Sequence, residues 1–111
     1  MEDLAAALAF ANYQSTLTQQ KNILRQKFRD DCILAQNGGL FLVTPEFIAG
    51  LQTIQTTTRY VLDMNSNPIL IENISQLVKD ALHCYETAIT AYGTEYSKIK
   101  TQRSVKALVG L

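Results

Sequence analysis

The residues that could perform nucleophilic catalysis are few and unfavourably spaced. The sequence has one histidine, His83, and it is followed directly by Cys84. Neighbouring side chains on a helix point about 100° apart, so this imidazole cannot readily activate the adjacent thiol. Cys32 could meet His83 only through a tertiary contact. A half-exposed histidine near Asp80 and a buried thiol beside it account for these residues, and we predict that the protein is not an enzyme.

Metal and cofactor sites are not predicted from the remaining polar residues. A structural zinc site needs about four cysteine or histidine ligands, and the chain has three such residues, two of them adjacent. Adjacent acids on a helix diverge, so the two acidic pairs are interpreted as a solvated surface. These pairs are Glu2-Asp3 and Asp30-Asp31. We expect no metal and no cofactor.

The glycine pair Gly38-Gly39 is the closest approach to a phosphate-binding motif. It lacks the Gly-Lys-Ser/Thr ending of a P-loop and the spacing of a dinucleotide-binding turn. Four apolar residues, 40–43, separate it from the helix start predicted at Thr44, about 13 Å away if that run is extended. The glycine amides and the helix N-terminus are therefore too far apart to hold one anion. We interpret Asn37-Gly38 as the end of a long helix, because both residues tolerate the left-handed conformation.

The charge balances overall but not along the chain. Ten basic and ten acidic residues give a net charge of zero, so the total favours neither nucleic acid nor a membrane surface. Residues 32–97 hold six acids and two bases, whereas residues 98–111 hold four bases and no acid. Cations near a helix C-terminus complement its dipole, which is the simplest account of this basic tail. Attraction between the ends of two copies is the alternative.

A basic stripe on the first helix raises nucleic-acid binding as an alternative function. Three cations follow at steps of four, so they share one side of a helix, and the tail adds three more that could contact phosphate. The six candidates are Lys21, Arg25, Arg29, Lys98, Lys100 and Arg103. The zero net charge, the acids that close the stripe and the lack of interleaved aromatic residues favour a solvated helix face instead.

The apolar pattern predicts a single domain over residues 1–111, without a linker, that is mainly α within the α+β class. The first helix is predicted over residues 4–36, with apolar side chains along one broad face. A short strand over 40–43 and a short helix over 45–56 follow, the helix being capped by Thr44.

A β-hairpin and a second long helix complete the predicted order, α-β-α-ββ-α. Strands are predicted over residues 59–63 and 69–71, around the turn residues 65–68. Residues 40–43 are a candidate third strand, so the sheet is either a small hairpin or three-stranded. The last helix follows the cap residue Asn73 and keeps apolar steps of three and four for about 26 residues. The basic tail, residues 98–111, is expected to fray.

The lengths of the two main helices predict self-association. A helix of about 33 residues is roughly 50 Å long, whereas a compact domain of this size has a radius of gyration of about 13 Å. Apolar side chains on such rods would stay exposed without a partner, so we expect a homo-oligomer. The predicted interface residues are Phe10, Leu17, Leu24, Tyr85, Tyr92 and Tyr96. The alternative is a first helix that breaks near residues 12–16 and packs as two pieces.

No export or membrane segment is predicted. The apolar run over residues 4–11 follows two acids, where a secretion signal carries cations. The run is also far shorter than the ~20 residues of a membrane span. We therefore expect a protein that is not secreted, has reduced cysteines and has no membrane partner.

Several segments resemble, in order along the chain, a small uncharacterised protein of contractile-tailed marine cyanophages. They are FANYQ at 10–14 with Leu17, NGG at 37–39 with Phe41, DMNSNPILI at 63–71, and Tyr96, Ile99, Lys100 and Arg103-Ser104-Val105. The resemblance implies a viral origin and a place in the virion or in the cytoplasm of an infected bacterium. It supplies no catalytic or binding residues. We expect an oligomeric structural or assembly protein of a phage, with other phage proteins as further partners. A small nucleic-acid-binding or host-modulating protein is the alternative.

Overall fold

The computed structural model describes residues 2–108, and it describes side chains from Asp3 to Thr101. Three helices and four short strands follow one another in this range. They are α1 (Glu2–Asp31), β1 (Ile33–Gln36), β2 (Gly39–Leu42), α2 (Pro45–Gln52), β3 (Arg59–Leu62), β4 (Pro68–Ile71) and α3 (Ile74–Leu108). The predicted fold, mainly helical with two long helices, a short one and small antiparallel β structure, is confirmed.

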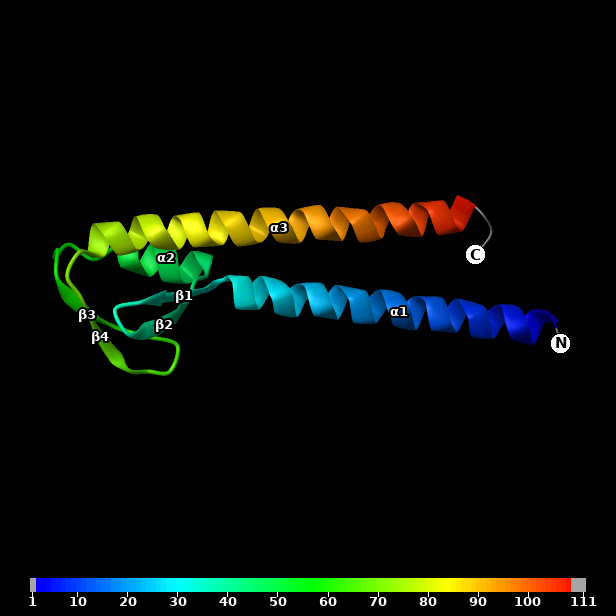
Figure 1. The fold of residues 1–111 in the computed structure, drawn as a ribbon, viewed down its shortest axis with the longest axis horizontal. Coiled ribbons are helices and arrows are strands. Elements are labelled where there is room, and N and C mark those ends of the chain that lie inside the picture. Colours follow the sequence, from blue (N-terminus) through cyan, green and yellow to red (C-terminus); the bar gives the residue numbers. More distant parts are fainter. Residues whose placement is uncertain (1, 109–111) are drawn as a thin grey trace.

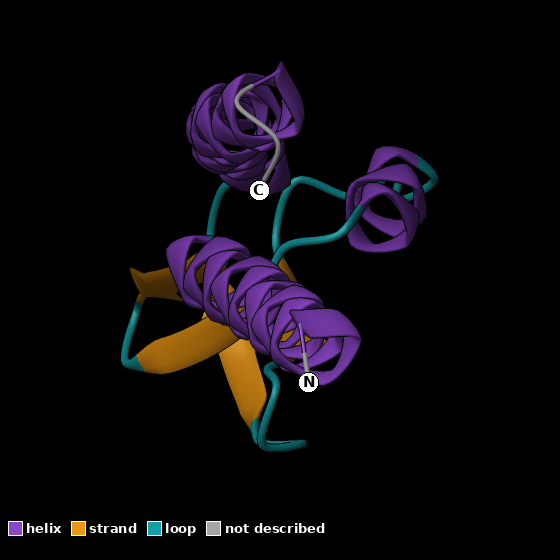
Figure 2. Cartoon of the chain, turned by 90° about the vertical axis from the view of Figure 1, so that its right-hand side faces the viewer, coloured by secondary structure: helices purple, strands orange, loops and turns teal. Residues whose placement is uncertain are grey.

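The molecule is a rod with a head at one end (Figure 1). The long helices α1 and α3 run antiparallel and form a stalk, while α2 and the four strands form the head (Figures 1 and 2). The overall extents are 69 × 23 × 20 Å and the radius of gyration is 20.5 Å, well above the ~13 Å of a compact domain. The helices therefore extend beyond the head.

The end of α1 differs from the sequence prediction. The helix runs without a break from Glu2 to Asp31 and stops there rather than at residue 36. The next four residues form β1, which pairs antiparallel with β2 so that Gln36 lies opposite Gly39. Asn37 and Gly38 form the two-residue loop between these strands, with φ of 52° and 82°. Positive φ at both positions is the geometry of a tight hairpin turn, so these residues reverse a strand rather than end a helix.

Helix α2 begins as predicted but ends early. The Thr44 side chain accepts a 3.0 Å hydrogen bond from the amide of Phe47, which caps the helix N-terminus. The helix ends at Gln52 rather than at residue 56. The hydroxyl of Thr53 donates to the carbonyl of Gly50 at 2.7 Å, and the following Thr-rich run has a low helix propensity because of its β-branched side chains.

The four strands form two separate hairpins, so the predicted three-stranded sheet does not occur. β3 pairs with β4 and β1 pairs with β2. The amide of Met64 donates to the carbonyl of Leu40 at 2.7 Å, which ties the two hairpins together. A Cβ atom on Gly39 would lie only 2.6 Å from Cγ1 of Ile69. The hairpins therefore approach each other closely, and glycine permits that approach.

The hydrophobic core lies in the head. Its largest fully buried side chains come from both hairpins, the segment after β2 and the start of α3, and they are Phe41, Val43, Ile71 and Leu77. Beyond the start of α3, which belongs to this core, the stalk contributes less: among the described residues its buried apolar side chains there are Leu17 and Ala88. The head is thus the folded base from which the stalk projects.

Asp63 organises the turn between β3 and β4. Its carboxylate accepts hydrogen bonds from the amides of Asn65 and Asn67, both at 2.9 Å, and from the amide of Leu40 at 3.3 Å. The bond from Asn67 contributes most to holding the pKa of Asp63 below its ordinary value of 3.8, because these donors stabilise the ionised form. The charge therefore belongs to the structure of the head.

Across residues 2–108, no helix combines the length and the apolarity required to cross a bilayer.

Candidate interaction surface

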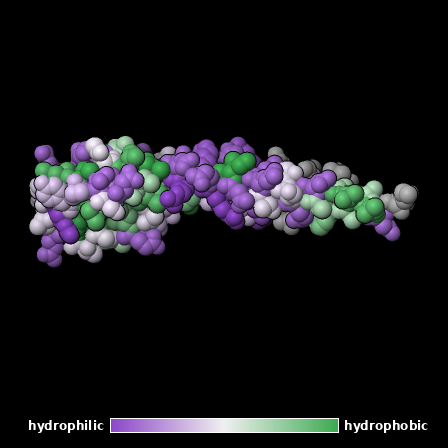
Figure 3. All heavy atoms as spheres, turned by 90° about the horizontal axis from the view of Figure 1, so that it is seen from below, coloured by the Kyte–Doolittle hydropathy of each residue, from purple (hydrophilic) through white to green (hydrophobic). Residues whose placement is uncertain are grey.

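The first turns of α1 form an exposed apolar surface, which we call the tip and define as residues 3–12. Every one of these residues is exposed, and residues 4–11 are all apolar. Leu4, Leu8 and Phe10 keep between 57% and 65% of their surface exposed. Figure 3, which views the molecule from the α1 side, shows apolar atoms gathered at this end beyond a hydrophilic middle. An exposed apolar surface of this kind is a candidate interaction site.

The tip is apolar around its whole circumference. Phe10 precedes Leu17 by seven residues, so both lie on the side of α1 that turns toward α3. Leu8 lies nine residues before Leu17, which places it on the opposite side. A helix that is hydrophobic all round is normally buried on every side. Residues 4–11 are five alanines, two leucines and one phenylalanine. Alanine and leucine have high helix propensity, so this segment can form a helix without a packing partner.

The tip stays bare because the stalk helices splay. α1 and α3 converge near the head and separate toward the end where both chain termini lie (Figure 1), and the end-on view shows their ends well apart (Figure 2). Phe10, on the side of α1 that carries the buried Leu17, remains 59% exposed. The basic end of α3, with Lys98 and Lys100, lies on the same end of the molecule as the tip.

Four of the six side chains predicted for an oligomer interface are buried or half-buried within the chain, namely Leu17, Leu24, Tyr85 and Tyr92. Phe28 of α1 stacks on Tyr92 with ring centroids 4.9 Å apart and meets Tyr85 edge-on at 6.1 Å. Leu17 is buried and Leu24 is half-buried. The spacing of Leu17 and Leu24 predicted that they share one side of α1, and α3 of the same chain covers much of that side. Phe28 was missing from the predicted set, although it follows Leu24 at the helical step of four.

Phe10 and Tyr96 are the members of the predicted set that remain exposed. Tyr96 has 42% of its surface exposed and meets Tyr92 edge-on at 6.4 Å. The residues that the sequence prediction missed on this surface are Leu4 and Leu8. The unbroken apolar run over residues 4–11 was the signal that could have identified them.

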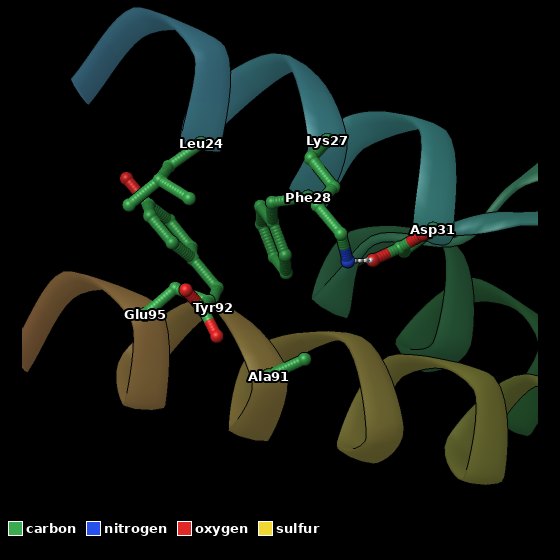
Figure 4. Close-up of a pocket in the computed structure, with 7 residues that line it drawn as sticks. All are labelled: Leu24, Lys27, Phe28, Asp31, Ala91, Tyr92 and Glu95. Carbon is green, nitrogen blue, oxygen red and sulfur yellow. Dashed lines mark hydrogen bonds and ion pairs between the residues drawn. The ribbon is translucent and has the colours of Figure 1, made fainter. Parts of the chain in front are cut away.

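A small cavity lies between the stalk helices (Figure 4). Phe28 and Leu24 point from α1 toward Tyr92 on α3, and Lys27 pairs with Asp31 at 2.8 Å. The hydrogen bond to Asp31 raises the pKa of Lys27. The cavity measures about 10 Å³, which is room for about one water molecule. This region holds the stalk together and does not form a binding pocket.

The basic residues considered for phosphate contacts are partly engaged inside the chain. The ammonium of Lys21 lies 5.9 Å from the centroid of the Tyr96 ring, a cation–π distance. Lys98 pairs with Glu95 at 3.0 Å, and Arg25 donates a hydrogen bond within its own helix. The other three candidates are Arg29 and Lys100, which are exposed, and Arg103, whose side chain lies outside the described range.

The side chains considered for nucleophilic catalysis are His83, Cys32 and Cys84. His83 is exposed on α3, while the thiol of Cys84 donates to the carbonyl of Asp31 at 3.3 Å. Burial raises the pKa of both Cys32 and Cys84, which lowers their nucleophilicity. No group of three or more His, Cys, Asp or Glu residues is placed to hold a metal among residues 2–108.

Comparisons with protein-family models, curated proteins and solved structures find no match for the chain.

Proposed function

We propose that this chain is a non-enzymatic structural or assembly protein that self-associates through the tip of its helical stalk. The observation that carries the proposal is the exposed apolar run over residues 4–11. These residues form helix at the end of a 69 Å rod, far from the hydrophobic core of their own chain. A second copy brings an identical long helix pair and the apolar surface needed to cover this run.

The magnitudes are consistent with a weak to moderate oligomer. Fully burying a leucine or phenylalanine stabilises by about 1.5–3 kcal/mol. Because Leu4, Leu8 and Phe10 are already partly covered, burying the remainder contributes roughly 1–2 kcal/mol each. Two copies of the tip would together supply roughly 6–12 kcal/mol, against an association cost of about 4–15 kcal/mol. The two ranges overlap, so we expect the assembly to depend on protein concentration.

The resemblance to a cyanophage protein gives this proposal its biological setting. A rod that self-associates through its tip suits a component of a virion or a factor that organises other phage proteins during assembly. Mass spectrometry of purified virions and of infected-cell lysate separates these roles. Detection in virions at a fixed ratio to the other virion proteins supports a structural component. Detection in the lysate alone supports an assembly factor.

Light scattering coupled to gel filtration tests the self-association. We expect a mass above the 12.4 kDa of one chain that rises with concentration. A tip variant, Leu4→Gln/Leu8→Gln/Phe10→Gln, removes apolar surface while keeping a good helix former at each position. It should elute as a monomer. The matched control is Ile23→Gln, because Ile23 is 67% exposed on the same helix outside the tip, and it should associate like the native chain. A native protein that remains a 12.4 kDa monomer at every concentration would show the proposal to be wrong.

A further inference from the structure

One side of α3 is covered by α2 near the head and is exposed farther along the stalk. Val78 lines a hollow together with Leu51 of α2, and α2, with eight residues, lies beside the first turns of α3 (Figure 1). Leu82 follows Val78 by four residues, and Ile89 and Tyr96 follow at steps of seven, so they continue the same side of the helix. These three side chains keep 38%, 37% and 42% of their surface exposed. An apolar stripe on α3 therefore continues beyond the helix that covers its start.

A groove runs along this stripe, and we call it the stalk groove. It is lined by Ile89, Tyr92, Gly93 and Tyr96, and its volume is about 320 Å³. A Cβ atom on Gly93 would meet nothing within 4 Å, so α3 leaves room here for a neighbouring backbone to approach closely. An exposed apolar groove between helices is a surface on which the apolar face of another helix can lie.

The stalk groove is flanked by basic residues of α1. The ammonium of Lys21 lies 5.9 Å from the centroid of the Tyr96 ring, which places this cation at the edge of the groove. Arg25 follows at a step of four, so it shares that side of α1. Residues 13–29 hold four bases and no acid, and residues 82–96 add two acids. The stalk around the groove therefore carries a net positive charge.

The tip of a second copy matches the groove in polarity, charge and length. Residues 4–11 are apolar and exposed, and residues 1–12 hold two acids and no base. The tip is about 15 Å long and the stripe from Leu82 to Tyr96 is about 21 Å long, so the tip fits along it. The head, with four acids and two bases over residues 33–80, offers the tip no such attraction. Complementary charge of this kind selects a partner surface.

We propose that the tip of one copy lies in the stalk groove of a second copy, with the acids of the tip beside the bases of α1. This inference rests on the proposed function, because it names the partner surface of the same tip. α1 runs without a break from Glu2 to Asp31, so a chain cannot fold its tip back into its own groove. Two copies that run antiparallel can each place a tip in the other's groove, which closes the assembly as a two-fold dimer.

Charge reversal with rescue tests this contact. The reversed tip, Glu2→Lys/Asp3→Lys, makes the tip basic, and the reversed groove, Lys21→Glu/Arg25→Glu, makes the edge of the groove acidic. Each variant alone brings like charges together, so the dissociation constant of its self-association should rise about 10-fold or more. In a one-to-one mixture the basic tip meets the acidic groove and the native tip meets the native groove, so association should return to near the native strength. Sedimentation velocity of the separate and mixed samples measures this, and circular dichroism melting verifies that each variant folds.

Single substitutions separate the local charge from the net charge. Arg25→Glu and Arg59→Glu change the net charge equally, but Arg59 is exposed on β3 in the head. Arg25→Glu should weaken association, whereas the matched control Arg59→Glu should associate like the native chain. Lys100→Glu reports on the basic end of α3 in the same way. If Lys100→Glu weakens association and Arg25→Glu does not, the tip meets the end of α3, which overturns the groove as its partner.

The remaining contrary outcomes distinguish this inference from the proposed function. The groove is overturned, and self-association stands, if the reversed groove associates like the native chain while Leu4→Gln/Leu8→Gln/Phe10→Gln is a monomer. A mixture that associates no better than either reversed variant alone also overturns it. Duplex DNA that binds the native chain and not the reversed groove would assign the basic edge to nucleic acid instead. A native chain that is itself monomeric overturns both proposals. If either double variant unfolds, Asp3→Lys and Arg25→Glu repeat the mixing, with the same outcomes deciding.

Discussion

Replacing Gly39 by alanine should destabilise the head by closing the space between its two hairpins. A Cβ atom at this position would lie 2.6 Å from Cγ1 and 3.1 Å from Cδ1 of Ile69, and 3.3 Å from Cε2 of Phe41. Ordinary carbon contacts are about 3.5–4.0 Å, so the closest pair must separate by roughly 1 Å. Phe41 is 1% exposed and the backbone of Ile69 is held in the β4 ladder, so the half-buried Ile69 side chain must shift to make room. We expect a loss of about 1–3 kcal/mol, the usual cost of overpacking.

Urea unfolding followed by far-ultraviolet circular dichroism measures this loss. The midpoint should fall while the slope with urea stays the same, because the surface exposed on unfolding hardly changes. Ile69→Ala removes the two atoms that the new methyl group meets first. Ile69→Ala should therefore cost about 1–3 kcal/mol less beside Gly39→Ala than alone, and a double-mutant cycle isolates that difference.

Gly50→Ala provides the matched control, because a Cβ atom at Gly50 would meet nothing within 4 Å. This substitution in α2 should leave stability unchanged or raise it slightly. The reasoning is refuted if Gly39→Ala is as stable as the native chain. It is also refuted if Ile69→Ala costs the same in both backgrounds.

Three further predictions concern the stalk, the head turn and the alternative function. Gly93→Ala should stabilise the protein by about 0.5–1 kcal/mol in urea unfolding, because Gly93 lies inside α3 with nothing within 4 Å of an added Cβ; a loss of stability would contradict the placement. Asp63, whose pKa is lowered mainly by the amide of Asn67, should stabilise the fold fully above its ordinary pKa of 3.8 and lose this effect as the pH falls through the lower folded-state pKa. The native chain should therefore exceed Asp63→Asn in melting temperature at neutral pH, and a difference that persists at pH well below 3.8 would argue against that role. Fluorescence anisotropy with a labelled duplex DNA should show no binding at physiological salt, because Lys21 packs on Tyr96; affinity that falls steeply with added salt would instead support the basic-stripe alternative.

At the end of the first helix, the sequence prediction extended the helical pattern over residues that form a strand. Residues 33–35 are apolar and fit either a helix turn or a short strand. Asn37-Gly38 flanked by apolar residues on both sides is a strong hairpin signal, and the structure uses it as the two-residue loop between β1 and β2. The local turn chemistry was thus available in the sequence. Giving it precedence over the continuing helix pattern would have predicted the hairpin.

The candidate surface depended on tertiary information that spacing alone does not contain. The helical spacing of Leu17, Leu24 and Tyr92 indicates that each faces a partner, but it does not say whether that partner is the same chain. The structure answers this for the middle of the stalk, where α1 and α3 pack against each other around Phe28. The exposure of Phe10, on the side of α1 that carries Leu17, goes with the separation of the two helices toward the chain ends (Figure 1). The elongated form, in contrast, followed directly from helix length.

The antiparallel stalk also sets the order in which the chain can fold. Each hairpin of the head pairs residues that are close in sequence, and such local contacts form quickly. The stalk joins residue 28 to residue 85 and residue 21 to residue 96, so the separation grows steadily toward the tip. Doubling the length of a loop raises the free-energy cost of closing it by only about 0.6 kcal/mol. Pairing of α1 with α3 can therefore extend from the head toward the tip, one helical turn after another. During synthesis α1 emerges before α3, so the apolar first turns of α1 are exposed for longer than the turns near the head before α3 can pack beside them.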